Sequence, residues 1–222
     1  MDGVMRRREM VQTGGTEDYV RDGLIFFLDG LNRGGVTGQW KDIIGNNIFT
    51  LTSACVEEDN CVNFSASGAY GTHSGVITTT SYTYNTIECA FSGWTSSAFL
   101  FSQPYSNSTK RISLVTGGRS TYINCAIVAD GTQRPRWNAL YDTKLLSLSN
   151  TTGVANLTEI SQGSNDSWYY LSGSTVYLAI RNGSASKYSG KIYGLRIYNR
   201  QLTADEMKQN QRVDMRRYGI TI

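Results

Sequence analysis

The residue best suited to proton transfer in this sequence is its single histidine, His73. A serine hydrolase needs such a histidine between a nucleophilic serine and an orienting carboxylate. His73 lies in the stretch 70–75, whose glycines and small polar residues are typical of a turn. No Gly-x-Ser-x-Gly elbow, the strained turn that presents a nucleophilic serine, occurs in the chain. We therefore interpret His73 as a surface-loop residue rather than a catalytic base.

Glycoside hydrolysis usually requires two carboxylates that face each other across a sugar. A Glu-x-Asp-x-x-Glu pattern would supply such acids from one strand, and the sequence lacks it. Glu57, Glu58 and Asp59 are consecutive, which favours an acidic turn, and Glu88 is the only acid in the strand-like stretch 84–91. The sequence therefore predicts that the protein is not an enzyme. A polysaccharide-acting enzyme with an unrecognised carboxylate pair is the alternative.

The four cysteines, Cys55, Cys61, Cys89 and Cys125, contain no Cys-x-x-Cys pair, so a structural zinc site is not expected. Cys89 and Cys125 lie in apolar runs and are interpreted as small core residues. Cys55 and Cys61 would close a short loop only in an oxidising compartment.

No cofactor is predicted. Calcium needs several oxygen ligands that converge on one point. The aspartates that follow strand-like or turn-like stretches are instead scattered along the sequence, and each is typical of a turn or loop cap; they are Asp29, Asp42, Asp130, Asp142 and Asp166. A calcium site is therefore not supported by a motif.

Aromatic side chains in polar loops are the best candidates for sugar binding, because a sugar ring can stack on an aromatic face. Trp94 follows a glycine among serines and threonines, and Tyr105 follows Pro104 in a polar stretch. Trp137 is preceded by arginines that offer hydrogen-bond donors. The predicted ligand-binding residues are Trp94, Tyr105, Arg134, Arg136 and Trp137. The alternative for each aromatic residue is a place in the core or on a sheet face.

The elements that must position these residues are predicted to be strands. Only 18% of the residues are charged, and β-branched and aromatic residues alternate with small turn-forming residues. Strand-like runs recur at close spacing, at 23–30, 47–52, 61–65, 84–91, 97–102, 111–115, 121–130, 143–148, 155–160, 167–171, 175–181 and 190–200. This pattern indicates an all-β fold, an antiparallel two-sheet jelly-roll sandwich. No apolar run approaches 20 residues, so no membrane span is expected.

A helix is predicted at 203–218. Thr203 and Glu206 have the spacing of a capping box, in which each side chain satisfies a backbone N–H of the other residue. Leu202 and Met207 occupy the positions of a hydrophobic staple. Gly219 is suited to end the helix.

The chain divides into an N-terminal arm, residues 1–18, and one domain, residues 19–222, that includes the helix. The arm is polar and carries Arg6, Arg7 and Arg8, but no apolar stretch follows them, so it is not a secretory signal. The net charge of +3 is modest, and no basic stripe interleaved with aromatic residues occurs between the two ends, so nucleic acid is not an expected partner.

The C-terminal stretch 190–211 resembles the closing strand and following helix of laminin-G-like, concanavalin A-like domains. The matching residues are Gly190, Ile192, Arg196, Ile197, Tyr198, Asn199, Arg200, Leu202, Thr203 and Glu206. The opening strand with its Trp-x-Asp-x-x-Gly turn, Trp40, Asp42 and Gly45, is also similar to that family. The arginine-rich start resembles the leaders of phage and prophage structural proteins of gut bacteria.

These resemblances imply binding rather than catalysis, through rim loops or a concave sheet. They imply a glycan-binding or adhesion domain of a phage tail, fibre or other virion surface protein, with a cell-surface polysaccharide as partner and virion subunits contacted through the arm. A purely structural virion or assembly protein is the alternative. The implied location is a virion or a cell-exterior structure, with the cytoplasm as the alternative. The chain could also form a homo-oligomer.

Overall fold

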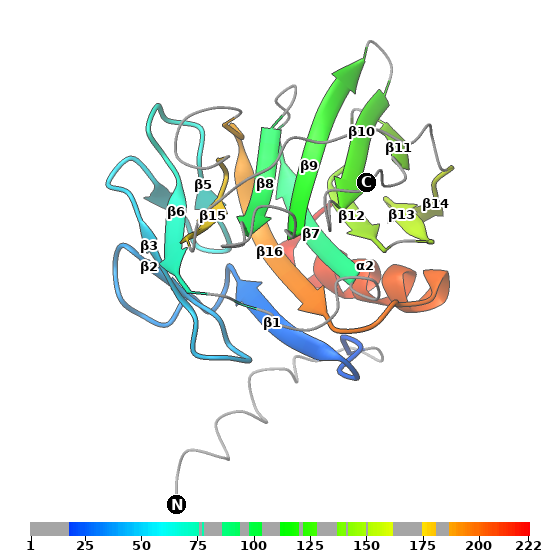
Figure 1. The fold of residues 1–222 in the computed structure, drawn as a ribbon, viewed down its shortest axis with the longest axis horizontal. Helices are drawn as coiled ribbons and strands as arrows, with labels where there is room; N and C mark the ends of the chain where they lie inside the picture. Colours follow the sequence, from blue (N-terminus) through cyan, green and yellow to red (C-terminus); the bar gives the residue numbers. More distant parts are fainter. Residues whose placement is uncertain are drawn as a thin grey trace, which may run out of the picture.

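The structure is a computed structural model (Figure 1), and it describes residues 18–75, 77, 86–93, 98–103, 112–119, 122–127, 137–140, 142–149, 151–161, 175–180 and 187–222. Within these ranges the strands form two antiparallel sheets of eight strands each, and the chain closes with a helix, α2 (Ala204–Tyr218). The predicted fold class, an all-β two-sheet sandwich with a C-terminal helix, is confirmed.

The first sheet, sheet 1, contains both the first and the last strand of the chain segments described. Its strands follow the order β14 (Thr158–Glu159), β13 (Gly153–Ala155), β12 (Leu145–Leu148), β7 (Thr86–Ser92), β16 (Lys191–Tyr198), β5 (Val62–Asn63) and β4 (Val56–Glu57). The opening strand β1 (Leu24–Asp29) also pairs with the closing strand β16, on the edge of β16 that β5 occupies further along.

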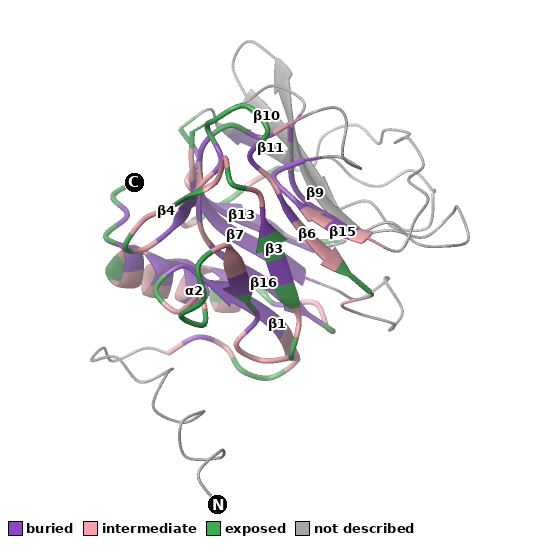
Figure 2. Ribbon diagram, turned by 90° about the vertical axis from the view of Figure 1, so that its left-hand side faces the viewer, coloured by how far each residue is buried: buried purple, intermediate pink, exposed green. Residues whose placement is uncertain are grey.

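The second sheet, sheet 2, consists of the remaining strands. Their order is β11 (Trp137–Leu140), β10 (Tyr122–Ile127), β9 (Ile112–Arg119), β8 (Ala98–Gln103), β15 (Thr175–Leu178), β6 (Gly71–Ser74), β3 (Ile48–Leu51) and β2 (Gln39–Lys41). Figure 2 shows sheet 2 on one side of sheet 1 and α2 on the other.

The main core lies between the two sheets. Alternate residues of each strand point into it, as the period of two in a strand requires. Its large, fully buried side chains include Phe26, Trp40, Phe49, Phe91 and Phe101. Two smaller apolar clusters lie instead between sheet 1 and α2, so sheet 1 is covered on both faces.

Most predicted strands are observed, with different bounds at several places. The stretch 155–160, predicted as one strand, is a hairpin of β13 and β14. Its two turn residues, Asn156 and Leu157, have φ of 46° and 64°, the left-handed region that a tight two-residue hairpin requires. The predicted strand 167–171 lies outside the described residues.

The Trp-x-Asp-x-x-Gly turn is held by the carboxylate of Asp42. Asp42 Oδ1 accepts hydrogen bonds from the backbone N–H groups of Phe27 and Ile44, both at 2.9 Å, and Oδ2 accepts one from Gly45 at 3.0 Å. The predicted structural role of Asp42 in a turn is confirmed, and the turn is thereby fixed to β1.

Helix α2 begins and ends as predicted. Thr203 and Glu206 form both hydrogen bonds of the capping box, and Gly219 takes a left-handed conformation, φ 67°, at the C-terminal end. Leu202 and Met207 pack in one apolar cluster. No helix in the described ranges is both long and apolar enough to cross a membrane.

Candidate functional site

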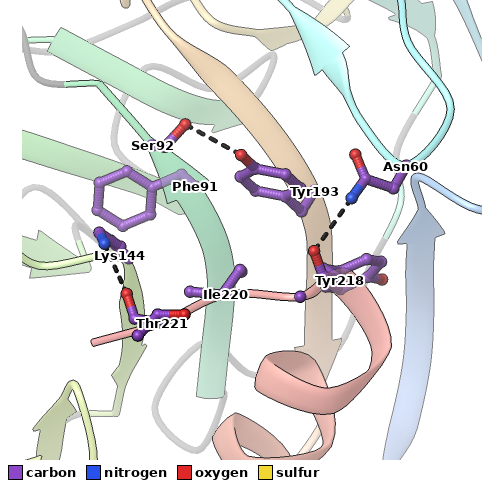
Figure 3. Close-up of a pocket in the computed structure, with 9 residues that line it drawn as sticks. Asn60, Phe91, Ser92, Lys144, Tyr193, Tyr218, Ile220 and Thr221 are labelled. Atoms are coloured by element: carbon purple, nitrogen blue, oxygen red, sulfur yellow. Dashed lines mark hydrogen bonds between the residues drawn. The ribbon is translucent and has the colours of Figure 1, made fainter.

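A pocket of about 320 Å³ opens on the outer face of sheet 1, where α2 ends (Figure 3). Five separate segments contribute to it. Its lining residues are Asn60, Phe91, Ser92, Lys144, Tyr193, Tyr218, Gly219, Ile220 and Thr221. The helix packs on the same face through its two apolar clusters, so the pocket lies beside the part of the face that the helix covers.

A β-bulge places Tyr193 in the pocket. In the pairing of β16 with β7, Ile192 lies opposite Phe91 and Gly194 lies opposite Ala90, so Tyr193 is an extra residue on β16. A bulge changes the direction of a side chain relative to the regular alternation of the strand. The ring of Tyr193 is therefore half-buried at the surface, with its hydroxyl 3.3 Å from Ser92 Oγ (Figure 3).

Tyr218 supports Tyr193 from the end of the helix. The centroids of the two rings are 6.0 Å apart, and Tyr218 is buried. Its hydroxyl donates a hydrogen bond of 3.0 Å to Asp29 Oδ1, and burial raises the pKa of this phenol well above its usual range. Gly194 leaves room for it, because a Cβ at Gly194 would lie 2.7 Å from Tyr218 Oη.

The polar groups of the pocket are mainly hydrogen-bond donors. Asn60 Nδ2 donates to the backbone carbonyl of Tyr218 at 3.0 Å, and Lys144 Nζ donates to that of Thr221 at 2.5 Å (Figure 3). An amide has two N–H donors and an ammonium has three, so both groups retain donors for a ligand. Half-buried aromatic surface beside several donors is suited to a polyhydroxylated ring, which has an apolar C–H face and a polar edge.

The titratable groups with the deepest burial form a separate network beneath α2. Arg196 donates one hydrogen bond of 2.9 Å to Glu88 and two of 2.6 Å to Asp214, and none of these side chains is more than 2% exposed. The guanidinium also lies 4.3 Å from the ring centroid of Tyr19. Burial raises the pKa of Glu88 although Arg196 opposes this shift. Because these acids are buried away from solvent, they anchor the helix to the sheet and are not accessible to a substrate.

A second polar surface crosses the outer face of sheet 2. The strand register places Gln39, Thr50, Thr72, Tyr177 and Ser102 side by side across five strands. Tyr177 is half-buried, and Ser102 is fully buried with a hydroxyl that makes no hydrogen bond. We take the sheet 1 pocket as the candidate site, because all of its lining residues are described.

Trp137 is the predicted ligand-binding residue whose position is described. It begins β11 and is 4% exposed, in the main core. Its ring fills the space above Gly153, where a Cβ would lie 2.8 Å from it. Trp137 thus takes the core position that was the alternative for this residue. Trp94, Tyr105, Arg134 and Arg136 lie outside the described residues and remain predictions.

His73 differs from its prediction as a loop residue. It belongs to β6, with its ring centroid 5.5 Å from that of Phe49 and Nδ1 3.0 Å from the carbonyl of Ile48. Pairing with β15 on one edge and β3 on the other explains the strand, because it satisfies backbone hydrogen-bonding groups of β6. Cys55, Cys61 and Cys89 are free thiols, and within the described ranges no group of three potential ligands could hold a metal ion.

The sequence itself matches no protein-family model and no curated protein. Solved structures do match. Trypanosoma rangeli sialidase in complex with the inhibitor DANA is similar with a TM-score of 0.60 and 12% identity, over 94% of this chain and 37% of the sialidase. The botulinum neurotoxin serotype D binding domain matches with a TM-score of 0.55 and 13% identity, over 84% of this chain and 51% of that one.

A structure of botulinum neurotoxin type C, whose cell entry depends on interaction with two ganglioside molecules, matches with a TM-score of 0.57 and 13% identity, over 84% of this chain and 50% of that one. The chain therefore spans about a third to a half of the length of these proteins. At such identities the similarity shows the fold alone, a β-sandwich.

The comparisons correct one prediction. The lack of a recognisable catalytic motif was taken to exclude an enzyme, but sialidases share the fold over 94% of this chain at 12% identity. At 12% identity, the absence of a known catalytic motif does not exclude catalysis. Proteins that share a fold can carry different functional residues in their loops. The prediction that the protein is not an enzyme is therefore wrong, because a missing motif is no ground for excluding catalysis. The shared fold does not by itself identify an activity.

Proposed function

We propose that this protein binds glycans, and that the sheet 1 pocket is the binding site. The observation that carries the proposal is the position of Tyr193, whose ring is turned by a bulge to a half-buried place beside the donors of Asn60, Ser92 and Lys144. Ligand sites commonly combine apolar or aromatic surface with a few placed polar groups.

The solved structures with this fold add support. They include a sialidase in complex with sialic acid and a toxin whose cell entry depends on gangliosides. Both proteins interact with sugar-containing molecules, and the fold is the property that they share with this chain. The proposal transfers the ligand class, a glycan, and not a particular glycan.

The matched variants Tyr193→Ala and Tyr177→Ala test the proposal. Both remove a half-buried tyrosine from a strand, one in the pocket and one on the outer face of sheet 2. We expect the wild type and Tyr177→Ala to bind the same members of a glycan array, and Tyr193→Ala to lose most of that binding. An array with no bound glycan for the wild type would reject the function. Equal losses in both variants would reject the site.

The finer proposal is that the glycan-binding domain is of laminin-G type and is displayed on a phage tail or fibre. The resemblance of the stretch 190–211 and of the arginine-rich arm supports it. Immunogold labelling of tails or fibres on induced phage particles would support this location, and labelling only outside particles would reject it. A purely structural role in the virion predicts instead assembly defects in particles that lack the domain.

Glycan cleavage is a second candidate, favoured by the sialidases that share the fold. Incubation of the purified chain with 3′-sialyllactose would release free sialic acid if the chain has this activity. Unchanged 3′-sialyllactose after prolonged incubation, with an active sialidase as positive control, would reject sialidase activity.

A further inference from the structure

We infer that the glycan taken by this pocket carries a carboxylate, and that Lys144 is the residue that pairs with it. This inference rests on the proposed function and names the ligand class for the same site. Among the residues that line the pocket, Lys144 has the only charged side chain. A neutral sugar would offer this ammonium group only hydrogen-bond acceptors, whereas a sugar acid would also bring an opposite charge.

Two acids that lie near pocket residues, Asp29 through its bond to Tyr218 and Glu58 two positions before Asn60, are engaged elsewhere. Asp29 pairs with Arg217 and accepts a hydrogen bond from the hydroxyl of Tyr218. Glu58 pairs with Lys191 at 2.5 Å and accepts a hydrogen bond from Asn63. Neither acid lines the pocket, so neither competes there with a ligand for Lys144.

The backbone of Lys144 is fixed on both sides. Its N–H donates a hydrogen bond of 2.9 Å to Asn156 Oδ1, and its carbonyl accepts one of 2.8 Å from the N–H of Phe91. The fixed backbone places the side chain beside the pocket, and the hydrogen bond from Nζ to the carbonyl of Thr221 already orders part of it, which lowers the entropy cost of binding. Lys144 is therefore held at the site before a ligand arrives.

The ammonium group retains capacity for an anion. Lys144 Nζ donates one hydrogen bond to the carbonyl of Thr221, and an ammonium has three protons. Figure 3 shows Lys144 and Tyr193 on different sides of the pocket, with the segment that carries Ile220 and Thr221 running along its lower edge. One ligand could thus place its sugar ring on Tyr193 and its carboxylate at Lys144, and so occupy both sides of the pocket.

The size of the effect follows from the exposure of the ammonium. An ion pair at a surface contributes modestly, because water and salt screen it. We therefore expect a preference of roughly 1.5- to fivefold for an acidic sugar over its neutral counterpart. The preference must shrink as salt is added.

The experiment compares ligands that differ only in the carboxylate. The probes are methyl β-glucuronide against methyl β-glucoside, and N-acetylneuraminic acid against its methyl ester, titrated by NMR at low and high salt. The proteins are the wild type, Lys144→Gln, Lys144→Arg, and the control Lys208→Gln, which changes a lysine on α2 outside the pocket. Thermal unfolding of each variant verifies that it is folded.

The inference predicts that the acid of at least one pair binds more tightly to the wild type and to Lys208→Gln. It also predicts that the preference disappears in Lys144→Gln and survives in Lys144→Arg. Equal binding of acid and neutral sugar, or a preference that persists in Lys144→Gln, would overturn the inference and leave glycan binding intact. No binding of any probe, together with an empty glycan array, would instead reject the proposed function.

Discussion

Arg196 of β16 and Asp214 of α2 form a two-point ion pair with both N–O distances at 2.6 Å, in a place where neither side chain is more than 2% exposed. The pair fixes the last turns of the helix to sheet 1. Tyr218 follows Asp214 by four residues and so lies on the same face of the helix, one turn closer to the pocket. The buried charges thereby help to determine where the pocket wall lies.

Removal of the guanidinium would be costly. In Arg196→Met, the carboxylates of Glu88 and Asp214 would lose their cation while still buried, so we expect a loss of about 3–5 kcal/mol in the free energy of unfolding. Urea denaturation measures this loss. The control Arg21→Met breaks an exposed pair with Asp18 and should change stability by less than about 1 kcal/mol. Equal stability of the two variants would contradict the assigned role.

The same network predicts a dependence on pH. Burial raises the pKa of Glu88 in the folded state, so folding favours the neutral acid, and the wild type loses this contribution as pH rises through that pKa. Glu88→Gln stays neutral, and its oxygen can still accept from Arg196 and Asn210. The stability of Glu88→Gln relative to the wild type should therefore increase from pH 4.5 upward, in unfolding experiments across pH. A constant difference would mean that folding leaves the pKa of Glu88 unchanged, and a decreasing one that folding lowers it; either result would contradict the prediction.

Gly194 should be required for the position of Tyr218. In Gly194→Ala the new methyl group would lie 2.7 Å from Tyr218 Oη, so the ring must move, at a cost of about 1–3 kcal/mol. Tyr218→Phe removes the hydroxyl, and the double variant should lose less stability than the sum of the two single variants. Additive losses in a double-mutant cycle would mean that the two residues do not interact in this way.

The cysteines should be insensitive to reductant and should react slowly with alkylating agents while the protein is folded. Cys55 and Cys61 are not bridged, so a reducing agent should leave the melting temperature unchanged. Burial, with a further contribution from Glu58, raises the pKa of Cys61 to about 12, and the scarce thiolate should make alkylation at pH 7 slow until the protein unfolds. Mass spectrometry measures the modification of each cysteine. A peptide that contains a Cys55–Cys61 disulfide would contradict the structure.

The predictions from sequence succeeded where the signal is local. The capping box of Thr203 and Glu206 and the stop at Gly219 fix both ends of α2, since each depends on residues a few positions apart. The turn at Asp42 is local for the same reason. His73 was misplaced because its strand is imposed by neighbours far away in the sequence.

The pocket could not be predicted in the same way. Asn60, Lys144 and Tyr193 are separated by long stretches of chain and meet only after the sheets form. The orientation of the Tyr193 ring depends on a β-bulge that no local sequence pattern indicates.

The most direct test of the central claim is an NMR titration of the isotope-labelled chain with a glycan that binds it, read residue by residue. Binding at the pocket predicts that the largest shift changes occur at Asn60, Ser92, Lys144, Tyr193 and Thr221. Changes confined to the row of Thr72, Tyr177 and Ser102 on sheet 2, with the pocket signals unmoved, would contradict it.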